Sequence, residues 1–288
     1  MEIKKIGVLG AGAMGSGIAQ LCAQTGYDVV MRDIADEFVQ RGFKGIEGFL
    51  AKSVEKGKMT EDDKKKIVGR IKGTTKIDDL KDVDFVIEAV LEDLELKKQV
   101  FQEVEKVTRP DVILATNTSS MSITEIGAGV KRSDKVVGLH FFNPVPLMRL
   151  IEIIKGMNTS DETIKTAWAF SEKLGKLPVL VKKDSPGFIV NRLMILQLME
   201  AIRIYEDGIA SIEDIDKAVK AGLNHPMGPF ELMDLTGIDI AYHVCDYFHR
   251  ELNQELKHVP PLTLKAMVRA GKLGKKSGEG WYKPTDKK

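Results

Sequence analysis

The sequence predicts an α/β domain built on a parallel sheet, followed by an all-helical domain. Three observations support this prediction. Strand-like and helix-like segments alternate over residues 1–184, a glycine-rich turn joins the first strand to the first helix, and every periodic segment after Asp184 is helical. Several strands are continuously apolar, as is typical of a parallel sheet that is covered on both faces.

The first domain, residues 1–184, contains alternating strands and helices with short connections. A helical stretch over 35–71 is interrupted near 55–63, where Thr60 and Asp63 resemble a capping box with Asp in place of Glu. The strand at 150–156 follows the strand at 135–142 closely and is able to return beside it. Strands are predicted at 3–10, 27–33, 84–90, 112–119, 135–142, 150–156 and 177–183, and helices at 13–26, 35–71, 93–107 and 161–175.

The second domain, residues 185–288, shows helical periodicity and no convincing strand. The boundary is predicted within KKDSPG, residues 182–187, where the composition changes. Helices are predicted at 188–208, 211–223, 229–235, 238–252 and 261–271.

The composition is typical of a soluble globular protein. Of 288 residues, 43% are hydrophobic and 30% are charged, and the net charge of +1 gives no indication of nucleic-acid binding. No window approaches ~18 uninterrupted apolar residues, and the N-terminus shows no signal peptide, so neither a membrane span nor secretion is predicted. Cys22 and Cys245 lie in apolar stretches far apart, which favours buried thiols in the cytoplasm over a disulfide or a metal site.

Gly10, Gly12 and Gly15 form a G-x-G-x-x-G turn between a strand and a helix. Such glycines permit a tight turn, a close approach of the backbone to a pyrophosphate, and close packing of helix on strand. Asp33 ends the next strand, 21 residues after Gly12, where a carboxylate accepts a hydrogen bond from a ribose 2′-hydroxyl and repels a 2′-phosphate. The pattern predicts a Rossmann-type domain that binds NAD. The adjacent Arg32 complicates the choice between NAD and NADP.

A second group of polar residues follows the later strands. His140 and Glu152 lie on neighbouring predicted strands, and a carboxylate that orients an imidazole suits proton transfer. A buried histidine satisfied by a neighbour is the alternative. The alternative for Ser119 is that it caps the helix starting near Ser122. The alternative for Asn191 is an ordinary polar residue in the first turn of the long helix.

The chain also resembles a known family in seven separated motifs. It resembles the short-chain-length type of 3-hydroxyacyl-CoA dehydrogenase, and most of all the bacterial 3-hydroxybutyryl-CoA dehydrogenases, over nearly its whole length. The resemblance implies a Rossmann domain, a helical domain that forms a homodimer, and NAD-linked interconversion of L-3-hydroxyacyl-CoA and 3-oxoacyl-CoA. The motifs are GAGAMGSGIA, VIEAVLEDLELKK, ATNTSSMSI, GLHFFNPVPLMRLIEII, DSPGFIVNRL, NHPMGPFEL and LGKKSGEGWY.

The resemblance implies a role for each matching residue. His140 is the implied general acid/base, Glu152 its partner, and Ser119 and Asn191 hydrogen-bond the substrate oxygens. The implied cofactor contacts are the glycine turn with Ala13 and Met14, then Asp33, Glu92, Lys97, Ser119 and Asn143. For Glu92 and Lys97, the alternative is a solvated charge pair near a helix start. The family usually has a proline where this chain has Leu196, which concerns a helix bend more than the chemistry.

Lys52, Lys56 and Lys58 form a basic cluster in a nearly neutral protein. The resemblance to the family's CoA-contacting arm is loose here, but lysines near a groove would attract the phosphates of CoA. The alternative is a solvated helix face.

The sequence therefore predicts an NAD-dependent 3-hydroxyacyl-CoA dehydrogenase, acting on 3-hydroxybutyryl-CoA in fatty acid or butyrate metabolism. Two rivals remain open. One is a dehydrogenase of a free hydroxy acid or sugar acid on the same fold. The other is a dinucleotide-binding protein without turnover.

Overall fold

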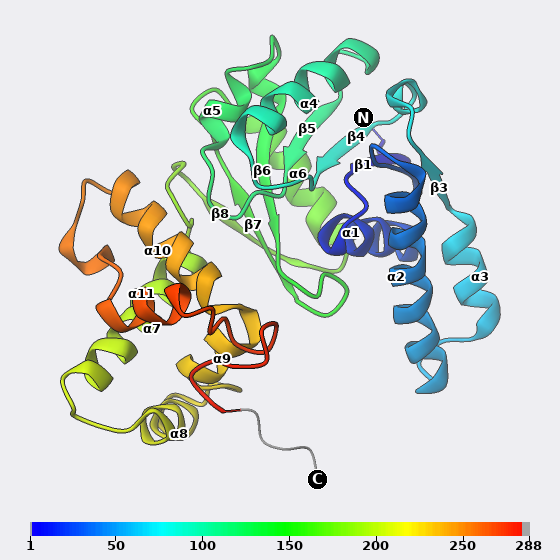
Figure 1. The fold of residues 1–288 in the computed structure, drawn as a ribbon. Coiled ribbons are helices and arrows are strands. Elements are labelled where there is room, and N and C mark those ends of the chain that lie inside the picture. Colours follow the sequence, from blue (N-terminus) through cyan, green and yellow to red (C-terminus); the bar gives the residue numbers. More distant parts are fainter. Residues whose placement is uncertain (1, 284–288) are drawn as a thin grey trace. The chain divides into compact units, whose positions relative to one another are not determined.

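The computed structural model describes residues 2–283 and divides into two compact units, Met1–Phe188 and Ile189–Lys288. Figure 1 shows the first unit as a sheet with helices and the second as helices joined by loops. Residue 1 and residues 284–288, at the outer ends of the two predicted domains, lie outside the described residues. The domain boundary predicted from the sequence, between residues 184 and 185, stays a prediction.

The first unit contains one eight-stranded sheet with the order β3-β2-β1-β4-β5-β6-β7-β8. All neighbours are parallel except β6 and β7, which pair antiparallel. The chain runs outward from β1 in one direction and then resumes at β4 on its other side, which is the topological switch where ligands bind in such sheets. The strands are β1 (Lys5–Leu9), β2 (Asp28–Arg32), β3 (Ile71–Thr74), β4 (Phe85–Glu88), β5 (Ile113–Thr116), β6 (Val136–Phe141), β7 (Leu150–Ile154) and β8 (Leu177–Val181).

Helices cover both faces of this sheet. In β4, Phe85 and Ile87 belong to one core cluster and Val86 to the other, because successive strand residues point to opposite faces. Burial on both sides explains the continuous apolar runs, and each large side chain contributes roughly 1.5–3 kcal/mol. One face holds α1 (Ala13–Gln24), α2 (Asp36–Glu55), α3 (Glu61–Gly69) and α6 (Asp161–Lys173); the other holds η1 (Ile77–Leu80), α4 (Leu94–Val107) and α5 (Ile123–Gly127). A short turn, η2 (Ser133–Lys135), precedes β6.

Two details of the first unit differ from the sequence prediction. Ile71, predicted as the end of a helix, begins the edge strand β3, which is too short to show an alternating pattern. The predicted parallel sheet also contains one antiparallel pair, because β7 returns directly beside β6. The capping box of Thr60 and Asp63 at the start of α3 is confirmed.

The second unit is helical, with its own apolar core. Its helices are α7 (Val190–Glu206), α8 (Ile212–Leu223), α9 (Pro229–Thr236), α10 (Ile238–Glu251) and α11 (Leu262–Arg269), with a short η3 (Leu256–His258). Helix α7 begins two residues later than predicted, since Phe188 has a positive φ of 51°. In the described part of this unit the extended pairing consists of one isolated bridge, between Gly274 and Glu279.

Two buried aspartates attach the closing segment of the second unit to α9. Asp216 accepts hydrogen bonds from the N–H groups of Phe230 and Glu231 and from the hydroxyl of Tyr282. Asp234 accepts from the N–H groups of Trp281 and Tyr282. The LGKKSGEGWY motif is therefore a structural element of this unit.

Among residues 2–283, no helix is long and apolar enough to cross a membrane. The same residues contain no group of three or more His, Cys, Asp or Glu side chains placed to hold a metal ion.

Candidate active site

A cavity of about 320 Å³ opens at the carboxyl ends of the central strands. Met14 borders it from the glycine turn, Glu92 and Lys97 from the segment after β4, and His140 from the end of β6. The cavity therefore joins the turn that follows β1 to the predicted acid/base residue. The lining residues are Met14, Ala89, Val90, Glu92, Lys97, Asn117, Ser119, His140, Phe141, Phe142 and Asn143.

The three glycines of the turn are required for different reasons. Gly10 has a φ of 95°, and a Cβ there would lie 2.5 Å from the carbonyl oxygen of Ala89. A Cβ on Gly15 would lie 1.9 Å from the carbonyl oxygen of Gly10. A Cβ on Gly12 would meet no atom within 4 Å. Packing within the protein explains Gly10 and Gly15, whereas the open space beside Gly12 fits the approach of a pyrophosphate.

Helix α1 begins directly behind this turn. Its N-cap is Gly12, which provides no side-chain cap, and its first turn contains no acidic residue. The free N–H groups at a helix N-terminus favour a phosphate. The turn and the helix start thus fit the pyrophosphate of a dinucleotide.

Asp33 lies at the end of β2 and contacts the same turn. Its Oδ2 accepts a hydrogen bond from the N–H of Ala11 at 2.7 Å, and its Oδ1 accepts from the N–H of Ile34 at 2.7 Å. Arg32 donates from Nε to the carbonyl oxygen of Thr75 at 3.3 Å. These two hydrogen bonds fix the carboxylate beside the glycine turn.

His140 and Glu152 form a buried pair. They are opposite each other in the antiparallel register of β6 and β7, and Nδ1 of His140 lies 2.8 Å from Oε2 of Glu152. The rings of Phe142 and Phe188 lie 4.5 and 5.6 Å from the imidazole, between centroids. The carboxylate and the two phenyl rings hold the imidazole in one orientation at the cavity wall.

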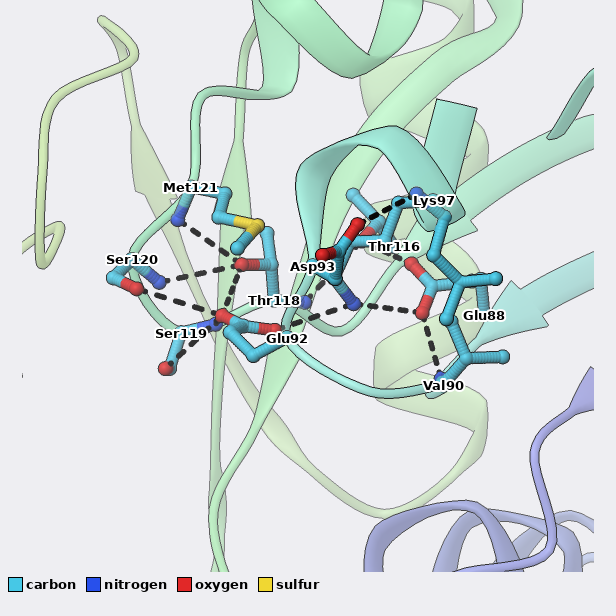
Figure 2. Close-up of polar contacts among 11 residues, drawn as sticks. Glu88, Val90, Glu92, Asp93, Lys97, Thr116, Thr118, Ser119, Ser120 and Met121 are labelled. Carbon is cyan, nitrogen blue, oxygen red and sulfur yellow. Dashed lines mark hydrogen bonds and ion pairs between the residues drawn. The ribbon is translucent and has the colours of Figure 1, made fainter. Parts of the chain in front are cut away.

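Figure 2 shows a network of charged and hydroxyl groups between β4 and β5. Lys97, 1% exposed, places Nζ 2.7 Å from Oε1 of Glu88 and 3.2 Å from Oε2 of Glu92. The alternative interpretation of Glu92 and Lys97 as a solvated charge pair is therefore wrong for Lys97, because its side chain is buried. Removing one member of a buried ion pair leaves an uncompensated charge and costs about 3–5 kcal/mol.

Glu92 is held in its charged form by its neighbours. Burial acts to raise the pKa of this carboxyl, but the Lys97 ammonium and hydrogen bonds from the Thr118 hydroxyl and the Ser119 N–H outweigh it. The pKa of Glu92 is therefore lowered from its usual range. The carboxylate stays ionised at neutral pH beside the cavity.

Ser119 lies in the loop after β5, within 3.4 Å of Glu92 through its hydroxyl. The cap of helix α5 is Ser122, which accepts a hydrogen bond from the N–H of Glu125, so the capping alternative for Ser119 is wrong. Asn117, in the same loop, accepts from the N–H of Phe141 through Oδ1 at 2.9 Å. This bond attaches the loop to the end of β6, close to His140.

The remaining predicted residues do not all lie at the cavity. Asn143 follows β6 and borders the cavity, whereas Asn191 belongs to the first turn of α7 in the second unit. Lys52, Lys56 and Lys58 are exposed at the end of α2 and in the turn beyond it.

Sequence reasoning missed three residues that shape this site. Glu88, Thr116 and Thr118 support the network from the ends of β4 and β5. The available signal was a glutamate within the apolar strand FVIE, since a charged residue in a strand buried on both faces requires a partner.

A glycine turn with an acidic residue directly after β2, and a buried histidine–carboxylate pair whose histidine borders the same cavity, define a dinucleotide-dependent oxidoreductase. Family comparison specifies the class further. Residues 5–185 match the family model "3-hydroxyacyl-CoA dehydrogenase, NAD binding domain", and residues 187–284 match "3-hydroxyacyl-CoA dehydrogenase, C-terminal domain". The chain belongs to the 3-hydroxyacyl-CoA dehydrogenase family, and its cofactor is NAD.

Individual relatives agree over nearly the full length. The chain is 45% identical over 278 residues to a 3-hydroxybutyryl-CoA dehydrogenase of Clostridioides difficile, covering 96% of this chain and 98% of the relative. It is 44% identical to the human mitochondrial hydroxyacyl-coenzyme A dehydrogenase, covering 98% and 91%. The crystal structure of (S)-3-hydroxybutyryl-CoA dehydrogenase from Ralstonia eutropha has a TM-score of 0.95 at 44% identity, covering 99% and 100%.

Proposed function

We propose that this protein interconverts L-3-hydroxybutyryl-CoA and acetoacetyl-CoA with NAD. The supporting observation is that His140, which is hydrogen-bonded to Glu152, and Met14 of the glycine turn border one cavity. A proton-transfer group and a dinucleotide turn are thus available to a single bound substrate. The family and the names of the relatives support the acyl-CoA class, and the bacterial relatives support the four-carbon acyl group.

In this proposal His140 moves the proton of the substrate hydroxyl. An ionised Glu152 accepts a hydrogen bond from Nδ1–H, which leaves Nε2 of the imidazole to accept or donate the substrate proton. Bound NAD supplies the acceptor for the hydride from substrate C3. Ser119, and Asn191 of the second unit, are proposed to hydrogen-bond the substrate oxygens.

The cofactor is proposed to contact residues that follow five strands, β1, β2, β4, β5 and β6. The pyrophosphate is assigned to the turn with its helix start, and the adenine ribose to Asp33. The nicotinamide end is assigned to Glu92, Lys97, Ser119 and Asn143, all of which border the cavity. The turn residues are Gly10, Gly12, Ala13, Met14 and Gly15.

The phosphates of CoA are proposed to contact Lys52, Lys56 and Lys58. These lysines are exposed at the end of α2 and in the turn beyond it, and none of them has an ion-pair partner within 4 Å among the described residues. Exposed cations without a local partner are available to an anionic ligand.

We further propose a cytoplasmic homodimer formed through the second domain, acting in fatty acid or butyrate metabolism. Two buried free thiols, Cys22 and Cys245, support a reducing compartment. Exposed apolar residues of the second unit, such as Leu193, Ile209 and Leu262, support a dimer surface. A monomer in light scattering at micromolar concentration would exclude the dimer.

The experiment that tests the activity is initial-rate oxidation of NADH with acetoacetyl-CoA and, separately, with free acetoacetate. Turnover of the thioester alone is expected. Turnover of the free acid without the thioester would instead identify a dehydrogenase of free hydroxy acids. Binding of NADH without turnover of either would identify a non-catalytic protein.

A further inference from the structure

Glu88 is a fully buried carboxylate that does not border the cavity. It ends β4 and lies behind Lys97, which does border the cavity. Its position in Figure 2 is on the far side of the lysine from Ser119 and Ser120. The proposed proton and hydride transfers make no use of Glu88, so its burial needs another explanation.

Three donors hold this carboxylate. Oε1 accepts from Nζ of Lys97 at 2.7 Å and from the N–H of Val90 at 2.7 Å, and Oε2 accepts from the hydroxyl of Thr116 at 2.6 Å. Such a complete set of donors fits an ionised carboxylate, which is an acceptor at both oxygens. Glu88 thereby places Lys97 and compensates its charge.

The charges of this group do not cancel. Lys97 lies closer to Glu88, at 2.7 Å, than to Glu92, at 3.2 Å. Two carboxylates and one ammonium leave a net charge of −1, and Glu92 is the member with a lowered pKa on the cavity side. Without Glu88, the pair of Lys97 and Glu92 would be neutral.

We propose that Glu88 is a positioning residue which, through Lys97, leaves this wall of the cavity negative and so favours oxidised over reduced cofactor. The inference rests on the proposed placement of the nicotinamide beside Glu92 and Lys97. The oxidised ring carries a positive charge and the reduced ring is neutral, so a negative wall stabilises the oxidised form selectively.

A purely structural role for Glu88 predicts something different. If the carboxylate only anchors the segment after β4, its loss weakens the binding of NAD⁺ and of NADH by the same factor. The ratio of the two dissociation constants then stays constant. The electrostatic role changes this ratio, which makes the ratio the informative quantity.

The test measures the dissociation constants of NAD⁺ and NADH separately, by calorimetry on the full chain, in Glu88→Gln and Glu88→Asp. Glu88→Gln keeps the shape and removes the charge. It should raise Kd(NAD⁺)/Kd(NADH) roughly four- to fifteen-fold, the effect of one unit charge on the order of 10 Å away at an effective dielectric constant of about 20–40. Glu88→Asp keeps the charge and should leave the ratio near the wild-type value, even if both affinities fall.

A matched control is Glu105→Gln, on the same helix as Lys97 but eight residues further along, about 12 Å of helical rise. It removes a glutamate charge away from the cavity, and the ratio should stay unchanged. If Glu88→Gln does not fold, Glu92→Gln removes a charge from the same group and should raise the ratio likewise.

An unchanged ratio in Glu88→Gln, or in Glu92→Gln where the first does not fold, would overturn the inference. A larger change in Glu88→Asp than in Glu88→Gln would overturn it too, because geometry would then matter more than charge. Failure of the wild-type protein to bind either cofactor would instead overturn the proposed function.

Discussion

Gly12→Ala separates cofactor binding from stability. The added methyl group meets no protein atom within 4 Å, and the φ of −66° and ψ of −172° are open to alanine. Alanine is a poorer N-cap than glycine, whereas it loses less chain entropy on folding by about 0.4–1 kcal/mol. The two effects oppose each other, so the free energy of unfolding should change by less than about 1 kcal/mol, or about 4 °C in Tm.

Affinity for NADH should fall much further. The methyl group occupies the space assigned to the pyrophosphate and displaces it from the N–H groups of the turn. Losing one hydrogen bond to a charged group is worth about 1.5–3 kcal/mol, so Kd should rise about 10- to 150-fold. The assay pairs NADH titration by fluorescence with thermal unfolding of the same preparation.

Two other glycines provide the controls. In Gly15→Ala the Cβ would lie 1.9 Å from a backbone oxygen, so stability itself should fall, by about 1–3 kcal/mol or more. Gly26, in the turn between α1 and β2, has a φ of 100° and open space around it. Gly26→Ala should lower Tm through backbone strain while NADH affinity stays unchanged. Wild-type affinity in Gly12→Ala would refute the assignment of the pyrophosphate to this turn.

Three further changes test other parts of the structure. Asp33→Ala should narrow the preference for NADH over NADPH by about tenfold or more. A carboxylate ~5 Å from a 2′-phosphate repels it by about 1.7 kcal/mol at a dielectric constant near ~40. An unchanged ratio of kcat/KM for NADH to kcat/KM for NADPH would contradict this. Substituting Lys52, Lys56 and Lys58 by Ala should raise KM for acetoacetyl-CoA at low salt and flatten its salt dependence, and an unchanged KM would remove them from the site. Partial burial acts to raise the pKa of Asp84, but hydrogen bonds from two backbone N–H groups and from an arginine outweigh this effect, so the pKa lies below its usual range. Its contribution to stability is present above pH ~4 and lost as pH falls through the lowered pKa, so the destabilisation in Asp84→Asn should shrink on acidification; a constant difference in urea unfolding would contradict this.

The sequence was sufficient for those parts of the fold that depend on local patterns. The glycine turn and the helix cap at Thr60 each follow from a few neighbouring residues. The pairing of His140 with Glu152 was also accessible, because two adjacent strands joined by a short connection can return beside each other. Edge strand β3 was not accessible from the sequence, since four residues with two buried side chains show no alternation of apolar and polar residues.

The charged network needed the structure. Glu88 and Lys97 are nine residues apart in sequence, and Thr116 comes from another strand. Only the parallel pairing of β4 with β5 brings Thr116 beside Glu88. A sequence shows that a buried glutamate needs partners, but not which distant residues provide them.

The His140–Glu152 pair makes the central mechanistic proposal testable through proton transfer. His140→Gln should lower kcat roughly 10²–10⁴-fold, the usual contribution of a general acid/base, with NADH affinity unchanged. Glu152→Gln should lower kcat for a different reason. A carboxylate beside an imidazole stabilises the charged ring, so its removal favours the neutral ring.

The most direct measurement is the pH–rate profile of wild type and Glu152→Gln in both reaction directions. Reduction of acetoacetyl-CoA needs the charged ring, so the variant should lose activity at a lower pH than the wild type. Oxidation of 3-hydroxybutyryl-CoA needs the neutral ring, so its rising limb should also move to lower pH, with a lower plateau because the ring is less well oriented. Limbs that stay at the wild-type pH in both directions would show that the two residues are not coupled, and would contradict the proposed acid/base pair.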